Sequence, residues 1–221
     1  MATSTPYLRI SRRAADRLRA GHLWVYRSDL MTSEAAQGEL AAGALLTVED
    51  PAGHPLGTAL YSSSSQIALR LVSRTPGLSR SQYLLDLKVR VAQAIQRRVH
   101  TAPLAGDPTA PGESNAQRLL FSEADGTPGI VADRYARLVI LQLLTQGTAQ
   151  DDVRQALVEA FRAALSPGDE PLSVIERPDP RIRELENLPA PAAGALFHQG
   201  TTDEQAPTAT NFLLNLSLIH I

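Results

Sequence analysis

Short stretches in which apolar and polar residues alternate, the spacing of a β-strand, fill most of the first third of the chain. In residues 65–74, Ile67, Leu69 and Leu71 recur at every second position and would share one face of a strand. Strands are predicted at four stretches: residues 7–10, 43–50, 55–62 and 65–74. Because short strands at such close spacing favour a closed, mostly antiparallel sheet, we expect a small β-barrel over residues 6–75.

One short helix interrupts this run of strands. Ser11 is suited to cap its start and Gly21 follows its end. Ala14, Ala15 and Leu18 recur at helical spacing and are its natural buried positions. The charged residues fall on the other side and include four arginines: Arg12, Arg13, Arg17 and Arg19. We therefore expect these arginines to project into solvent.

The spacing of apolar residues changes after a linker at residues 74–80. Apolar side chains recur every three or four positions through residues 81–100, which predicts a long amphipathic helix. Its other face carries four cations, for which a solvated surface and a contact with a nucleic-acid backbone are alternatives: Lys88, Arg90, Arg97 and Arg98. Further strands are predicted at residues 118–123, 130–135, 138–144 and 172–179, and helices at 149–166 and 180–188. This second part, about residues 80–190, is expected to be an α+β domain.

A group of carboxylates stands out in the stretch Phe121–Tyr135, FSEADGTPGIVADRY. Glu123, Asp125 and Asp133 surround two glycines and a proline. Paired carboxylates can perform acid–base catalysis, but that chemistry needs a cleft and partners such as a histidine or a nucleophile. No such partner lies at an interpretable spacing here, so we favour the turn of a β-hairpin over a carboxylate active site.

Composition narrows the chemistry further. The 221 residues include no cysteine, which excludes disulfides, thiolate metal sites and a cysteine nucleophile within this chain. The five histidines lack the spacing of a metal site, so we expect no metal. No run approaches the roughly 20 apolar residues of a membrane span, and no segment has a signal-peptide core. We expect a cytoplasmic protein without a membrane partner.

The near-neutral net charge of −2 hides an uneven distribution. Residues 1–100 carry 13 Lys and Arg against 7 Asp and Glu, whereas residues 101–221 carry 8 against 16. A basic first half suits a phosphate-rich partner, because lysine and arginine release counterions when they neutralise phosphates. A solvated, arginine-rich surface is the alternative interpretation.

Four ordered blocks of sequence resemble the large-subunit rRNA methyltransferase I family. They lie at Gly21–Leu30, Gly57–Arg74, Arg118–Tyr135 and Val174–Leu188 and span most of the chain. The resemblance implies an S-adenosylmethionine-dependent enzyme that forms 5-methylcytosine in 23S rRNA. It also implies three domains: an N-terminal PUA domain, a central α+β domain and a C-terminal Rossmann-like methyltransferase domain. The barrel and the α+β part expected above correspond to the first two.

The chain departs from that family in the features that carry catalysis. None of its 14 glycines forms the G-x-G-x-x-G turn that cradles a nucleotide cofactor. The family's covalent mechanism needs a cysteine nucleophile, and the chain has none. We therefore expect a fold class of PUA-like barrel plus small α+β domain with the Rossmann-like methyltransferase domain absent. On this reading the fragment binds no S-adenosylmethionine and has no catalytic residues, although the intact protein uses that cofactor.

The end of the sequence supports the same expectation. Residues 191–215 would form a linker and the start of a strand, Asn211–Asn215, that leads into the catalytic domain. The last six residues, LSLIHI, resemble the translation of an adaptor used to prepare DNA libraries, and residues 216–221 are therefore expected to be an adaptor-derived tail. A genuine C-terminal strand is the alternative, because these residues are largely apolar.

The expected function is RNA recognition on behalf of an rRNA cytosine methyltransferase, with 23S rRNA as the partner. A stand-alone, non-catalytic RNA-binding protein is the alternative, and a protein-interaction module is a weaker third. The residues expected to bind RNA are Arg12, Arg13, Arg17, Arg19 and Trp24. The arginines suit phosphate contacts. Trp24 could stack on a base, since aromatic residues do so in RNA-binding modules, but a place in the barrel core is the favoured interpretation. The hydroxyls of Ser62–Ser65 could reach phosphates, but a plain connecting loop is the simpler interpretation.

Overall fold

The computed structural model describes residues 6–31, 40–101, 116–166, 168, 171–189 and 196–199. The chain divides into two compact units. The first comprises Met1–Asp86, Leu144–Val153 and Asp179–Ala190, and the second comprises Leu87–Leu143, Arg154–Pro178 and Pro191–Ile221. Each unit is therefore assembled from stretches that lie far apart in the sequence.

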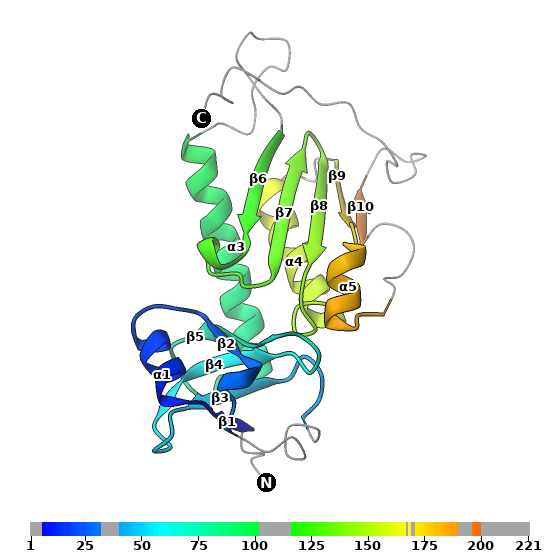
Figure 1. Ribbon diagram of the computed structural model, residues 1–221. Helices are drawn as coiled ribbons and strands as arrows, with labels where there is room; N and C mark the ends of the chain where they lie inside the picture. The colour runs from blue at the N-terminus through cyan, green and yellow to red at the C-terminus, as the bar shows by residue number, and fades with distance from the viewer. Residues whose placement is uncertain are drawn as a thin grey trace, which may run out of the picture. The chain divides into compact units, whose positions relative to one another are not determined.

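The first unit is built on a mostly antiparallel sheet (Figure 1). Its described strands are β1 (Tyr7–Arg9), β2 (Trp24–Tyr26), β3 (Leu45–Glu49), β4 (Pro55–Tyr61) and β5 (Ile67–Ser73). They are arranged in the order β1-β3-β4-β5-β2. The pair β1 and β3 is parallel, and the other neighbours are antiparallel. A bridge between Ile10 and Leu30 brings together the segments that follow the two edge strands.

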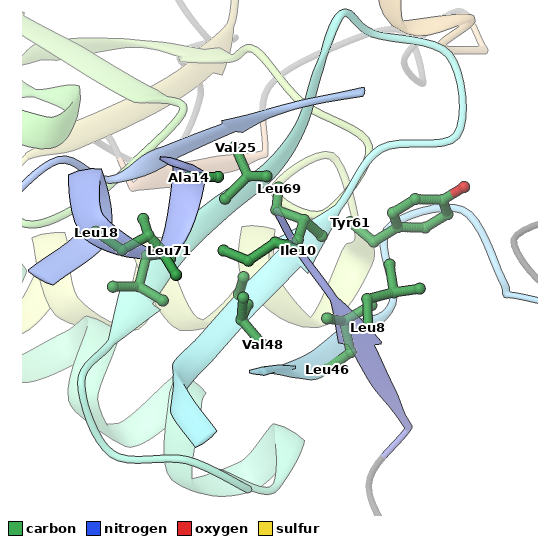
Figure 2. Packing of buried hydrophobic residues seen from close by; sticks show 12 residues of the cluster. Leu8, Ile10, Ala14, Leu18, Val25, Leu46, Val48, Tyr61, Leu69 and Leu71 are labelled. Carbon is green, nitrogen blue, oxygen red and sulfur yellow. The ribbon is translucent and has the colours of Figure 1, made fainter. Parts of the chain in front are cut away.

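The apolar side chains of this sheet meet in one closed core, which Figure 2 shows at close range. The labelled residues come from the strands, from Ile10 just after β1 and from helix α1 (Arg12–Arg19), and they form one cluster of buried side chains: Leu8, Ile10, Ala14, Leu18, Val25, Leu46, Val48, Tyr61, Leu69 and Leu71. Each is at most 3% exposed. The burial of this apolar surface is the main force that holds the sheet and α1 together.

Helix α1 forms as its sequence predicts. The Ser11 hydroxyl accepts a hydrogen bond of 3.2 Å from the Ala14 amide, so Ser11 is the N-cap. Ala14, Ala15 and Leu18 are buried, as predicted. Gly21 follows the helix with a φ of +107°, a conformation that favours glycine.

Two later stretches complete the first unit: residues 144–153 and helix α5 (Pro180–Glu186). Asp179 caps α5 by accepting hydrogen bonds from the amides of Arg181 and Ile182. Asn187 ends the helix in the left-handed conformation, with a φ of +49°. Sequence patterns predicted this helix but not that it packs within the first unit.

The second unit also contains one sheet in its described residues. Its strands are β6 (Ala116–Phe121), β7 (Ile130–Tyr135), β8 (Leu138–Leu143), β9 (Leu172–Glu176) and β10 (Phe197–Gln199), in the order β10-β9-β8-β7-β6. Two long helices, α3 (Arg80–Thr101) and α4 (Asp151–Leu165), contribute to its core, and α4 runs behind the strands in Figure 1. Phe161 of α4 is fully buried, as are Leu119, Ile130 and Leu141 of the sheet.

One connection in this sheet overturns part of the expected fold class. Strands β8 and β9 are parallel, with Leu138 opposite Ser173, and α4 forms the crossover between them. Parallel neighbours joined by a helix are the building unit of Rossmann-like folds, because a hairpin cannot connect parallel strands. The expectation that a Rossmann-like methyltransferase part is absent from this α+β chain is therefore wrong.

Within the described residues, no helix has both the length and the apolar character needed to span a bilayer. The predicted strand at Asn211–Asn215 and the expected tail at residues 216–221 lie outside the described residues.

Candidate functional site

The first two arginines of α1 are directed into solvent. Arg12 and Arg13 are exposed, while the opposite side of the helix is buried against the sheet. Among the described residues, neither of them has a hydrogen-bonding or ion-pair partner in the chain. Their positive charges are therefore available to an anion, as the sequence suggested.

Arg17 is held more firmly than its neighbours on α1. Its guanidinium forms an ion pair with Asp29, and the same carboxylate accepts a hydrogen bond of 2.8 Å from the Ser11 hydroxyl. The guanidinium carbon also lies 5.5 Å from the ring centroid of Tyr26. This distance is in the range of a cation–π contact. Arg17 is thus oriented by two partners from the segment that contains β2.

Arg19 forms ion pairs with two aspartates of the first unit. Its guanidinium lies 2.6 Å from the Asp50 carboxylate and 3.3 Å from that of Asp16. Asp50 organises the turn between β3 and β4, because its carboxylate also accepts hydrogen bonds from the amides of Ala52 and His54. The hydrogen bond from the His54 amide is the largest of the effects that hold the pKa of Asp50 well below its usual value, and the contact with Arg19 adds to it. Arg19 is therefore a structural residue in addition to a candidate for RNA binding.

An open depression of about 540 Å³ lies against α1. It is lined by Arg12, Arg13, Asp16, Arg17, Ala20 and His22. Arg17 is neutralised by Asp29, but Arg12 and Arg13 outnumber the one lining carboxylate, so the depression carries a net positive charge and suits an anionic ligand. We call it the α1 depression.

Trp24 does not lie in the barrel core, and the expectation that favoured the core is wrong. Its side chain is 38% exposed, because the buried position of β2 is its neighbour Val25. The guanidinium carbon of Arg70, the residue opposite Trp24 on β5, lies 5.3 Å from the Trp24 ring centroid. The ring therefore presents itself to solvent together with a cation, which is compatible with stacking on a base.

Tyr26 shares this outer face, and sequence analysis missed it. It is 40% exposed, and the burial pattern of β2 places both aromatic residues on the side opposite Val25. The alternation of Trp24, Val25 and Tyr26 was the available signal, but three residues are too few to show which face is buried.

The loop Ser62–Ser65 forms hydrogen bonds with other residues of the first unit. The Ser62 hydroxyl donates to Glu186, and both the amide and the hydroxyl of Ser63 donate to the Gln146 side chain. Arg27 donates to the carbonyls of Ser62 and Ser65. These contacts support the connecting-loop interpretation over a role in phosphate binding.

The carboxylate stretch around Asp125 also has a structural explanation. It forms a short 3-10 helix (η2, Ser122–Asp125) between β6 and β7, and Gly126 ends it in the left-handed conformation. Asp125 accepts hydrogen bonds from Arg97, Arg98 and the Phe121 amide. Burial would raise the pKa of Asp125, but these contacts outweigh it and lower the pKa overall. A carboxylate held ionised by two arginines supports the turn interpretation.

The cations of α3 are likewise engaged by residues of the second unit. Lys88 pairs with Glu159 of α4, Arg90 donates to the Gly126 carbonyl, and Arg97 and Arg98 bind Asp125 as described. These contacts lie within the second unit, to which α3 belongs from Leu87 onward, and they explain the four cations without a nucleic-acid partner. The described part of the chain contains no cluster of three or more potential metal ligands.

Comparison with known proteins identifies relatives for both parts of the chain. A family model described as a PUA-like domain matches residues 8–74. The chain is 35% identical over 148 residues to the ribosomal RNA large subunit methyltransferase of Deinococcus radiodurans, a match that covers 65% of this chain and 34% of that protein. It is 27% identical over 217 residues to the ribosomal RNA large subunit methyltransferase I of Pseudoalteromonas translucida, covering 98% of this chain and 50% of that protein. The chain thus spans a third to a half of the length of these relatives.

Two solved structures share its fold. One is a Streptococcus mutans protein described as a SAM-dependent methyltransferase, with a TM-score of 0.58 and 17% identity, covering 78% of this chain and 41% of that one. The other is described as a methyltransferase complexed with SAH, with a TM-score of 0.56 and 18% identity, covering 78% and 40%. Because methyltransferase structures match most of this chain, they agree with the correction drawn from the β8–α4–β9 crossover.

Proposed function

Because this chain carries a PUA-like domain and is homologous over most of its length to the ribosomal RNA large subunit methyltransferase I proteins, we propose that it recognises RNA for such an enzyme. The partner is 23S rRNA, and the reaction of the complete enzyme is the S-adenosylmethionine-dependent methylation of a cytosine at carbon 5. The site of action is the cytoplasm, where ribosomal RNA is modified. The relatives' names and the SAH complex of the second solved structure support this proposal.

The observation that carries the proposal is the exposed basic face of α1. Arg12 and Arg13 are free of partners among the described residues and line the α1 depression with Arg17. Contacts of this kind bind phosphates and position an RNA without reading its bases, so binding is tolerant of sequence and falls steeply with salt.

We also propose that this chain contributes recognition and not methyl transfer. Formation of 5-methylcytosine by a covalent route requires a cysteine nucleophile, and the 221 residues contain none. They also contain no G-x-G-x-x-G turn to cradle the cofactor. The Rossmann-like crossover in the second unit therefore serves the fold, and the methyl donor binds elsewhere in the complete enzyme.

Two measurements on the purified chain test this division of labour. Titration calorimetry with S-adenosylmethionine should show no saturable binding, and incubation with radiolabelled cofactor and 23S rRNA should transfer no methyl group. Binding of the same rRNA, followed in parallel by fluorescence anisotropy, should be saturable at low salt. Saturable binding of S-adenosylmethionine would contradict the proposal that the methyl donor binds elsewhere. Absence of RNA binding would contradict the proposed function.

A further inference from the structure

The outer face of β2 adjoins the α1 depression. Tyr26 provides the link, because Arg17 both lines the depression and lies against the Tyr26 ring, 5.5 Å from its centroid. Two residues earlier on the same strand and the same face stands Trp24. Helix α1 and strand β2 are in contact within the first unit.

Trp24 and Tyr26 are far enough apart along β2 to act as separate stacking sites. Residues two apart on a strand lie about 7 Å from each other, roughly twice the separation of stacked bases. Each ring is paired with its own arginine, Trp24 with Arg70 and Tyr26 with Arg17. Both rings nevertheless stay 38% to 40% exposed. A planar ligand can therefore stack on either ring or on the guanidinium plane beside it.

We propose that Trp24 and Tyr26 stack on two successive unpaired bases of an RNA whose phosphates occupy the α1 depression. This inference rests on the proposed RNA binding and adds the class of RNA structure that is recognised. In an RNA duplex the base faces are stacked on each other, so exposed aromatic rings select loops, bulges and single strands. The arginines contribute charge as well as stacking area, which favours a polyanion with flat bases over an apolar peptide.

The single tryptophan of the chain makes this proposal directly measurable. Trp24 is the one tryptophan among the 221 residues, so intrinsic fluorescence reports on it alone. A labelled single-stranded RNA should quench this emission with the same dissociation constant that anisotropy gives. A duplex and an abasic strand of equal length and charge should leave the emission nearly unchanged.

Substitutions separate stacking from charge. The double variant Trp24→Ala/Tyr26→Ala should bind single-stranded RNA at least about tenfold more weakly, because stacking contributes about 1–3 kcal/mol per base, while its salt dependence stays the same. Tyr7→Ala is the matched control. Tyr7 is 55% exposed and lies 5.8 Å from the Arg9 guanidinium carbon, but it does not line the α1 depression. Its loss should change the affinity by less than about twofold.

Three outcomes are distinguishable. Quenching by the single strand together with weaker binding of the double variant supports the stacking site. RNA binding without quenching, with equal quenching by duplex, or with unchanged affinity in the double variant overturns the stacking site and leaves the proposed RNA binding intact. No binding of any RNA overturns both. Conservative replacement by Trp24→Phe/Tyr26→Phe should retain most of the affinity, and the circular dichroism spectrum of Trp24→Ala/Tyr26→Ala should match that of the parent, which excludes a folding defect as the cause of the loss.

Discussion

The Ser62 hydroxyl donates a hydrogen bond of 2.7 Å to the Glu186 carboxylate, although the two residues lie 124 positions apart in the sequence. Both side chains are buried, at 4% and 3% exposure. Gln146 joins the same network, since its side-chain amide donates to the Glu186 carbonyl at 2.7 Å and its backbone amide approaches the Glu186 carboxylate at 3.3 Å. Three distant stretches of sequence therefore meet in the first unit through one buried polar cluster.

Removal of the Ser62 hydroxyl should destabilise the protein. Ser62→Ala leaves a buried carboxylate without one of its hydrogen-bond donors, which costs about 1–3 kcal/mol. Urea unfolding followed by circular dichroism measures this loss. Ser28→Ala is the control, because Ser28 is exposed and should change the free energy of unfolding by no more than about 0.5 kcal/mol. Equal stability of the two variants would show that the cluster does not contribute to folding.

Asp50 should make the stability of the chain depend on acid pH. Because the folded state lowers its pKa, the carboxylate stabilises the fold above its unfolded pKa of about 3.9, and this contribution is lost as the pH falls toward the folded value. Asp50→Asn should therefore unfold at a lower urea concentration than the parent at pH 7. The difference between the two midpoints should shrink as the pH falls below about 4. A midpoint difference that stays constant from pH 7 to pH 2 would contradict a lowered pKa of Asp50 in the folded state.

The β6–β7 hairpin offers a comparison of two ion-paired aspartates. The Asp125 side chain is 6% exposed, whereas its partners Arg97 and Arg98 are 56% and 22% exposed, so Asp125→Ala should cost about 2 kcal/mol through the loss of charge-assisted hydrogen bonds. The Asp133 side chain is 21% exposed and pairs with Arg118, which is 44% exposed. Asp133→Ala should cost less than about 1 kcal/mol. Thermal unfolding of both variants measures the two effects, and an equal loss would show that burial does not distinguish the pairs.

Local features of the fold followed from the sequence because they depend on neighbouring residues. The cap at Ser11 and the buried face of α1 are set within one or two helical turns. The turn at Asp125 was favoured for the same reason, through the glycines that follow it. The network of Ser62, Gln146 and Glu186 left no local signal in the sequence. Its three residues lie far apart along the chain and meet only in the folded unit.

The two incorrect predictions, a buried Trp24 and the absence of a Rossmann-like part, have physical causes as well. A strand of three residues such as β2 does not reveal which side faces the core, so Trp24 was expected inside when Val25 takes that place. The strands β8 and β9 and the helix between them were each predicted, but their parallel arrangement was not inferred. A helix that connects two strands is the usual sign of a parallel pair. The absence of a G-x-G-x-x-G motif favoured the opposite conclusion, although β8, α4 and β9 form a Rossmann-like connection without it.

The central claim, that the basic face of α1 binds RNA phosphates, is tested most directly by the salt dependence of binding to a 23S rRNA fragment. We predict that the logarithm of the association constant falls linearly with the logarithm of the salt concentration, and that Arg12→Gln/Arg13→Gln flattens this slope by up to about two units. Arg137→Gln/Arg181→Gln removes the same charge from two other exposed positions and should leave the slope unchanged. Equal slopes for the parent and the Arg12→Gln/Arg13→Gln variant, with the fold intact by circular dichroism, would contradict the claim.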